Sequence, residues 1–297
     1  MAGDSSGFSQ EHIEHYREHG YVIVENFLSA DELSRSHDEI EMFIPGWLDY
    51  ARDPAGPKPD GWDQAKDRRR VRFPFSGSQL NANTLHPELR RFAAIMAGGN
   101  PIVCEQSDLS IKCKGHRNDQ EQHMHVDYNN HTLAYPPDLP TFWQTAYLLY
   151  YTDVSEAQAP TAVCSRRHYT ERILWPTSYS PKARPELYAN EVKTIVPAGS
   201  LLAYSMRTFH RGTAFTAEGA RVAQFITYSP AGYPWLGIVG WPEQAVRPEF
   251  TTWLESASLE DRALFGFPPP GHPYWTQETL DGVSARYPNM DMTPYKT

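Results

Sequence analysis

The chain has 297 residues, of which 40% are hydrophobic, and its formal net charge is −9. This length and composition suffice for a substantial core, and we predict a single domain over residues 1–297. The acidic balance argues against a general nucleic-acid-binding protein, because contacts to phosphates require a basic face. A small molecule is the more plausible partner.

No run of 18 or more apolar residues occurs, and the first residues lack the basic and apolar pattern of a signal peptide. We therefore predict a cytoplasmic protein without membrane contact. The cysteines Cys104, Cys113 and Cys164 are too few and too scattered for a disulfide framework or a cysteine-based zinc site. We expect them to be buried thiols.

The N-terminal segment predicts a helix followed by a strand. Ser9 can cap a helix that ends at Gly20, and Phe8 and Ile13 are placed as a hydrophobic staple around that cap. Residues 21–24 are then typical of a strand.

A second helix is predicted from the capping-box pair Ser29 and Glu32, which precedes an apolar stripe at helical spacing. Residues 49–75 are rich in proline, glycine and charge, and we predict a long loop with little regular structure there. Its basic side chains favour a solvated loop over a lid or an anion contact: Lys66, Arg68, Arg69, Arg70 and Arg72.

After a helix near residues 87–97, short strand-like runs separated by turns continue to residue 228, for example 109–113 and 145–151. Many short strands indicate a sandwich or barrel, and the jelly roll is the form that cupin-like metal proteins use. From residue 231 onward the composition changes to glycine, proline and aromatics. We expect this extension to be mainly structural, although it could also cap a site or form a dimer contact.

The pair His125 and Asp127 is the first candidate for metal binding. Four His-x-acid matches occur among the 12 histidines, and two of them, His12-Ile13-Glu14 and His37-Asp38-Glu39, fall in helix-patterned segments. Residues two apart on a helix point away from each other, whereas on a strand they project to the same side. His125 and Asp127 are the pair for which a strand is plausible.

His210 and Arg221 form the second candidate element, because His210 alone among the histidines has an arginine eleven residues downstream. Residues 196–204 are typical of a turn and a strand, and residues 221–228 alternate like the next strand. We predict a hairpin that brings Arg221 beneath His210. Two imidazoles and one carboxylate leave one face of an iron open, and a guanidinium suits a carboxylate co-substrate.

These motifs make the chain resemble the phytanoyl-CoA dioxygenase family of Fe(II)- and 2-oxoglutarate-dependent oxygenases, from about Phe8 to Pro230. The likeness includes residues 159–168, similar to the family's Gly-Pro-Thr…Pro-Gly-Ser-His stretch, although Ser165-Arg166-Arg167 replaces Pro-Gly-Ser. The resemblance implies a double-stranded β-helix, with flanking helices. It also implies Fe(II) on His125, Asp127 and His210, with 2-oxoglutarate and O2 as co-substrates.

The resemblance assigns further roles. Arg221 is expected to hold the distal carboxylate of 2-oxoglutarate, with Thr161 as a hydroxyl donor to the same molecule. His123 stands where several relatives carry a co-substrate-binding glutamine. The presence of Asp127 favours hydroxylation, because halogenases of this broad group look as if they lose that carboxylate.

Other residues are candidates with an equally simple structural interpretation. Lys112 is a further possible carboxylate contact. Two sets could line a substrate pocket, or else form a polar turn and an ordinary aromatic core: Tyr128, Asn129, Asn130 and His131, and Trp143, Tyr147, Tyr204 and Trp235. Two alternative functions remain, namely a cupin-like metalloenzyme independent of 2-oxoglutarate and a non-catalytic ligand-binding barrel.

Overall fold

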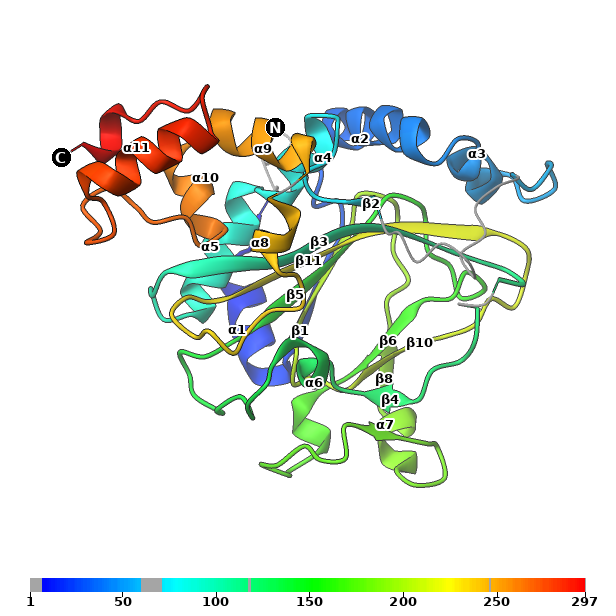
Figure 1. The fold of residues 1–297 in the computed structure, drawn as a ribbon. Helices are drawn as coiled ribbons and strands as arrows, with labels where there is room; N and C mark the ends of the chain where they lie inside the picture. Colours follow the sequence, from blue (N-terminus) through cyan, green and yellow to red (C-terminus); the bar gives the residue numbers. More distant parts are fainter. Residues whose placement is uncertain (1–6, 60–70, 117–118, 246, 297) are drawn as a thin grey trace.

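The computed structural model describes residues 7–59, 71–116, 119–245 and 247–296. Two antiparallel sheets face each other, and helices cover the outside (Figure 1). The predicted class, a mostly β jelly roll with flanking helices, is confirmed. The residues Lys66, Arg68, Arg69 and Arg70 of the predicted basic loop lie outside the described part of the chain.

The major sheet has six strands in the order β1-β9-β5-β11-β3-β2, and the minor sheet has five in the order β7-β4-β10-β6-β8. The major strands are β1 (Tyr21–Val24), β2 (Val71–Arg72), β3 (Ile102–Cys113), β5 (Thr145–Tyr150), β9 (Leu201–Ser205) and β11 (Ala220–Pro230). The minor strands are β4 (Met124–His125), β6 (Thr161–Cys164), β7 (Ser178–Tyr179), β8 (Glu191–Lys193) and β10 (His210–Gly212).

The two sheets enclose one hydrophobic cluster, and a second lies between the major sheet and the helices on its outer face. The helices are α1 (Gln10–His19), α2 (Ala30–Phe43), α3 (Trp47–Arg52), α4 (Gln79–Thr84), α5 (Pro87–Met96), α6 (Tyr128–His131), α7 (Pro185–Ala189), α8 (Trp241–Gln244), α9 (Pro248–Ser256), α10 (Leu259–Leu264) and α11 (Gln277–Arg286), with 3-10 turns η1 (Arg166–His168) and η2 (Thr293–Tyr295).

The N-terminal predictions are confirmed by their caps. Ser9 caps α1 with its side chain, and Gly20 ends the helix at a φ of 81°, a left-handed conformation that glycine adopts at little cost. Ser29 and Glu32 form a reciprocal capping box at α2. Cys104, Cys113 and Cys164 are free and buried, as expected.

Two predictions need correction. The loop predicted over residues 49–75 begins within α3, and its far end contributes β2, where Arg72 pairs with the buried Asp108 at 2.6 Å instead of being solvated. The predicted hairpin of His210 and Arg221 is wrong, because β10 and β11 belong to opposite sheets. Eleven residues suffice to cross between sheets, so the spacing does not distinguish the two arrangements.

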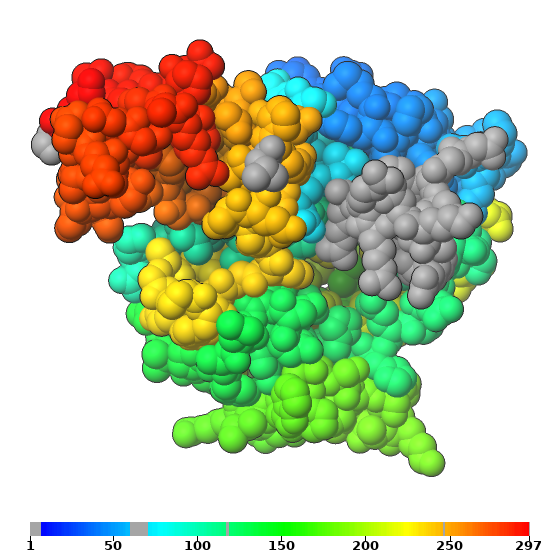
Figure 2. All heavy atoms as spheres, viewed as in Figure 1, coloured from blue at the N-terminus to red at the C-terminus, as the bar shows by residue number. Residues whose placement is uncertain are grey.

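The C-terminal extension has two parts. Residues 231–240 pass beside α6, where Leu133 N–H donates to the Trp235 carbonyl and Gly237 N–H to the His131 carbonyl; Figure 2 shows the yellow and green segments in contact. The helices that follow pack on the outer face of the major sheet, and the indole of Trp241 donates to the Cys104 carbonyl at 2.7 Å (Figure 1). These helices therefore add apolar side chains to the hydrophobic cluster on that face.

None of the helices in the described ranges is long and apolar enough to cross a membrane.

Candidate active site

The three predicted metal ligands lie together between the sheets. His210 of β10 pairs in register with His125 of β4, so the two imidazoles project side by side, with ring centroids 4.5 Å apart. Asp127 follows β4 at the start of α6 and places one carboxylate oxygen 3.4 Å from His125 Nε2 and the other 3.2 Å from His210 Nε2. The three ligand atoms lie within 4.8 Å of one another, which suits a single metal ion.

Main-chain carbonyls fix both histidine rings. His125 Nδ1 donates to the carbonyl of His123 at 2.7 Å, and His210 Nδ1 donates to the carbonyl of Thr208 at 3.0 Å. Each bond uses the backbone two residues before the histidine itself. Because Nδ1 carries the hydrogen, Nε2 is free to bind a metal, as is usual for metal-bound histidines.

The electrostatics of Asp127 favour the charged carboxylate. Burial by itself would raise the pKa of Asp127, but His210 and His125 beside it lower that pKa well below its ordinary value. Tyr204 also points its hydroxyl at the carboxylate, 3.4 Å from Oδ2, and burial together with Asp127 raises the Tyr204 pKa well above 10. Tyr204 therefore remains a protonated donor that orients Asp127.

Two buried cations face the same cavity from the major sheet. Arg221 of β11 and Lys112 of β3 lie directly opposite each other in register, and both are only 7% exposed. Neither forms an ion pair with a carboxylate in the described part of the chain, and Arg221 Nε has no hydrogen-bond partner there. Burial lowers the pKa of Arg221, and burial and the charge of Arg221 lower that of Lys112 to about 8.

The neighbours of Arg221 hold it with neutral oxygens only. Its guanidinium donates to the carbonyl of Ala159 and, at 3.3 Å, to the hydroxyl of Thr161. Thr161 Oγ1 also accepts a hydrogen bond from Tyr150 at 3.1 Å. With both lone pairs engaged, the Thr161 hydroxyl retains its own hydrogen for a ligand in the cavity.

One cavity of about 790 Å³ connects these groups, and His125, Asp127, His210, Arg221, Thr161, Lys112 and His123 all line it. The predicted co-substrate residues therefore meet the predicted metal ligands in one space. His123 is exposed and precedes β4, and its clear contact is the carbonyl bond to His125. Its proposed contact with 2-oxoglutarate stays a prediction.

Some of the substrate-pocket candidates line the cavity and others do not. Asn129, Asn130 and His131 line the cavity, whereas Tyr128 is buried and donates to the Leu174 carbonyl at 2.6 Å. Of the four aromatic candidates, only Tyr204 lines the cavity. Trp143 and Tyr147 pack on the outer face of the major sheet, and Trp235 stacks on Phe142 with ring centroids 5.7 Å apart.

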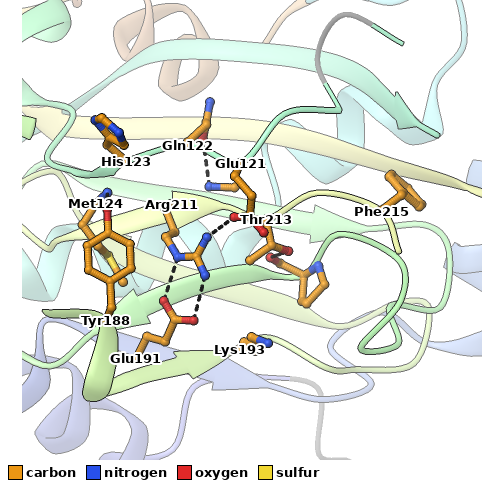
Figure 3. A network of polar contacts seen from close by, with 12 residues as sticks. Glu121, Gln122, His123, Met124, Tyr188, Glu191, Lys193, Arg211, Thr213 and Phe215 are labelled. Atoms are coloured by element: carbon orange, nitrogen blue, oxygen red, sulfur yellow. Dashed lines mark hydrogen bonds and ion pairs between the residues drawn. The ribbon is translucent and has the colours of Figure 1, made fainter. Parts of the chain in front are cut away.

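An ion-pair network supports the metal ligands from the other side of the minor sheet. Arg211, which follows His210 and so faces outward, binds Glu191 through two nitrogens at 2.7 and 2.9 Å and also contacts Glu121 (Figure 3). The Tyr188 hydroxyl beside it accepts a 2.9 Å bond from the Met124 backbone, next to His125. This network holds β4 and β10, the two strands that carry the histidines, in place.

Sequence reasoning did not identify Glu105 and Gln144, which hold the cavity residue His131 from behind. Glu105 is buried and accepts hydrogen bonds from His131 Nδ1 at 3.1 Å and from Gln144 Nε2 at 3.2 Å. Neither residue belongs to a local motif, because the three contact partners lie 26 and 39 residues apart in the sequence. Only the fold brings them together.

Comparisons with known proteins agree with this geometry. The fold is shared with solved structures of other proteins, three of which follow. The first is the non-haem α-ketoglutarate-dependent carbocyclase SnoK from nogalamycin biosynthesis, with 20% identity, a TM-score of 0.56, and coverage of 81% of this chain and 92% of the other.

The second is HygX from Streptomyces hygroscopicus, solved with nickel and 2-oxoglutarate, with 15% identity, a TM-score of 0.53, and coverage of 76% and 88%. The third is AviO1 from Streptomyces viridochromogenes Tue57, with 18% identity, a TM-score of 0.52, and coverage of 75% and 96%. No curated protein matches the sequence significantly.

The family model described as phytanoyl-CoA dioxygenase matches residues 16–223, which is most of the chain. The match includes the metal-ligand candidates and Arg221. It confirms the prediction of an iron- and 2-oxoglutarate-dependent oxygenase. The chain belongs to the phytanoyl-CoA dioxygenase family.

Proposed function

We propose that the chain uses Fe(II), 2-oxoglutarate and O2 to oxidise a C–H bond of a small molecule, by hydroxylation in the simplest case. The observation that carries this proposal is the pairing of a His-Asp-His triad with two buried, carboxylate-free cations in one cavity. Lys112 donates to the Thr213 carbonyl and Arg221 to the Ala159 carbonyl and the Thr161 hydroxyl, so both cations have neutral partners only. A buried charge without a counter-ion is costly, and this pair therefore suits a bound anion.

The proposal assigns a role to each residue of the candidate site. His125, Asp127 and His210 hold the metal, and Tyr204 orients Asp127 through its hydroxyl. Arg221 lines the cavity without an ion pair to a carboxylate among the described residues and can bind a distal carboxylate there, with Lys112 and the Thr161 hydroxyl beside it. When bound, iron and 2-oxoglutarate supply the oxidising power.

The rest of the protein positions the substrate and limits water. The cavity of about 790 Å³ extends beyond the metal and the two cations, and its remaining wall is formed by polar and apolar side chains. Holding the target C–H bond close to the metal would be the main catalytic contribution of these residues, since the iron and 2-oxoglutarate supply the oxidising power.

The alternative of a cupin-like metalloenzyme independent of 2-oxoglutarate gives Arg221 no role. The alternative of a non-catalytic ligand-binding barrel gives no role to the His-Asp-His triad. If the protein were such a metalloenzyme, the Arg221→Ala variant would keep full activity. The buried guanidinium of Arg221, which lines the cavity without a carboxylate partner among the described residues, favours the co-substrate interpretation instead.

We also propose that residues 1–297 form one domain, because the outer hydrophobic cluster runs from Phe8 to Tyr295, and that the protein is cytoplasmic, which fractionation can test.

The decisive test is an anaerobic titration of the protein with Fe(II) and 2-oxoglutarate, observing the visible metal-to-ligand charge-transfer band. The wild type should develop the band, and His210→Ala should lose it together with bound iron. Arg221→Ala should retain iron but need far more 2-oxoglutarate. Bound iron without a band in the wild type would rule out 2-oxoglutarate as the co-substrate.

A further inference from the structure

Glu105 occupies an irregular position in the longest strand pair of the molecule. Thr227 of β11 pairs with Gln106, whereas the next residue, Tyr228, pairs with Cys104, so Glu105 is the extra residue of a β-bulge. A bulge changes the direction of a side chain relative to the regular alternation, and bulges are frequent beside active sites. Here the bulge directs a carboxylate to the inner side of the sheet, toward His131.

The bulged carboxylate holds one imidazole in a fixed orientation. Glu105 binds His131 Nδ1 with one oxygen and Gln144 with the other, and all three side chains are buried, with His131 and Glu105 each 3% exposed. Since Nδ1 donates to the carboxylate, the neutral ring carries its lone pair on Nε2. Nε2 has no hydrogen-bond partner in the part of the chain that the structure describes, and His131 lines the cavity.

His131 lies at the end of the cavity away from the two cations. Lys112 and Glu105 are seven positions apart on β3, which corresponds to roughly 20 Å along a strand. Arg221 and Lys112 mark the co-substrate end, and the metal triad lies between the sheets. The far end is thus available to the molecule that is oxidised.

The surroundings of His131 combine hydrogen-bonding groups with an apolar surface. The amides of Asn129, Asn130 and Gln106 line this end, together with Phe225 and Ile238. No acidic or basic side chain lies free among these residues. This wall suits a neutral or weakly basic ring that carries hydroxyl or amino groups better than it suits a long alkyl chain.

We infer that His131, held by Glu105 and Gln144, binds a hydroxyl or amino hydrogen of the substrate through Nε2, and that the substrate is a hydroxylated or aminated small molecule. The inference rests on the proposed oxygenase function, because only then does the far end receive a substrate. His131 is a substrate contact in this scheme, and Glu105 and Gln144 are positioning residues. No proton transfer to His131 is required.

The test uses the full-length protein loaded anaerobically with Fe(II) and 2-oxoglutarate. Defined probes are titrated calorimetrically and then assayed for O2-dependent succinate release: myo-inositol, a methyl glycoside, an aminocyclitol, a deoxy analogue of each, and palmitoyl-CoA. At least one hydroxylated or aminated probe should bind and stimulate succinate release. Its analogue lacking the contacted group should bind about tenfold more weakly, the value of one hydrogen bond of about 1.4 kcal/mol.

His131→Asn is the informative variant, because an asparagine amide can occupy the Nδ1 position and keep Glu105 paired while the Nε2 acceptor is lost. It should raise the KM of the responsive probe about tenfold and leave the KM of its deoxy analogue unchanged. Glu105→Gln should raise the same KM to a smaller extent, and His131→Gln, whose amide reaches the Nε2 position, should restore part of the affinity. Thr132→Val is the matched control, since its hydroxyl donates to the Tyr128 carbonyl at 2.9 Å outside the cavity lining.

Three outcomes would overturn the inference: no stimulation by any hydroxylated or aminated probe, stimulation by palmitoyl-CoA alone, or an unchanged KM in His131→Asn. The charge-transfer band separates this failure from a failure of the proposed function. A wild type that forms the band while His131→Asn behaves normally refutes only the role of His131. A wild type with bound iron and no band refutes the oxygenase proposal itself.

Discussion

The two ends of the cavity use buried charge in opposite ways. At one end, Arg221 and Lys112 lie side by side with no carboxylate to neutralise them within the described residues. At the other end, Glu105 is fully engaged by His131 and Gln144. The first arrangement lowers stability as long as no anion is bound. In the second, the charge of Glu105 is satisfied by its neighbours, and Glu105 orients the imidazole of His131. We therefore expect the unpaired charges to bind a charged ligand and the paired charge to position a side chain.

The largest effect is expected between these ends, at the metal. Asp127→Ala removes a metal ligand and also the acceptor that holds His125 and His210 together, so we expect activity to fall on the order of 10³-fold. Bound iron after gel filtration and succinate release measure the two losses. Asp138→Ala, which removes an exposed carboxylate paired with Arg166, should change neither quantity. Full iron occupancy in Asp127→Ala would contradict the assigned ligand set.

Two arginines test the comparison directly. Arg221→Met should weaken 2-oxoglutarate binding about 100-fold, or about 2.7 kcal/mol, without lowering the melting temperature of the apoprotein. Arg211→Met should do the reverse, because it leaves Glu191 without its partner: a loss of about 1–3 kcal/mol in unfolding free energy and unchanged 2-oxoglutarate affinity. Titration of the charge-transfer band measures the 2-oxoglutarate affinity of each variant, and denaturant unfolding measures its unfolding free energy. Equal destabilisation by the two variants would remove the distinction drawn above.

Lys112 should make co-substrate binding depend on pH. Burial and Arg221 lower its pKa from 10.5 to about 8, so the native state loses this proton at a lower pH than the unfolded state does. Stability should therefore rise with pH between about 8 and 10.5, while 2-oxoglutarate affinity falls through pH 8 as the ammonium is lost. Lys112→Met should remove both trends, raise neutral-pH stability by about 1–3 kcal/mol, and weaken binding about tenfold. A wild-type affinity that stays constant from pH 7 to pH 9 would exclude Lys112 from the anion site.

What could be predicted from the sequence depended on whether the signal was local. The cap at Ser9 and the glycine at the end of α1 act within a few residues, and both helices of this region were correctly placed. The spacing of His210 and Arg221 selected two residues that line the same cavity. It could not show that β10 and β11 lie in opposite sheets, because a chain of that length can either turn back or cross.

No local sequence motif identifies Glu105 and Gln144, the residues that position His131. A bulge exists only as a shift in register between two strands, so the sequence of β3 alone cannot show that Glu105 is the extra residue. Its partners lie on unrelated elements, His131 as the last residue of α6 and Gln144 directly before β5. Arg72 shows the same limit, since its basic neighbours suggested a solvated loop while its actual partner, Asp108, lies on another strand.

The smallest effect is expected at Ala159, whose carbonyl helps to hold Arg221 at the charged end. Ala159 has a φ of 52°, in the left-handed region where a Cβ costs roughly 1–2 kcal/mol. Ala159→Gly should remove this strain and, after the extra entropy lost by glycine on folding, stabilise the protein by about 0.5–1 kcal/mol. Ala162→Gly, in the regular strand β6, should instead destabilise it by a similar amount. A denaturant midpoint that moves the same way in both variants would show that the left-handed conformation of Ala159 carries no strain, and that the fold tolerates alanine there without cost to the anchor of Arg221.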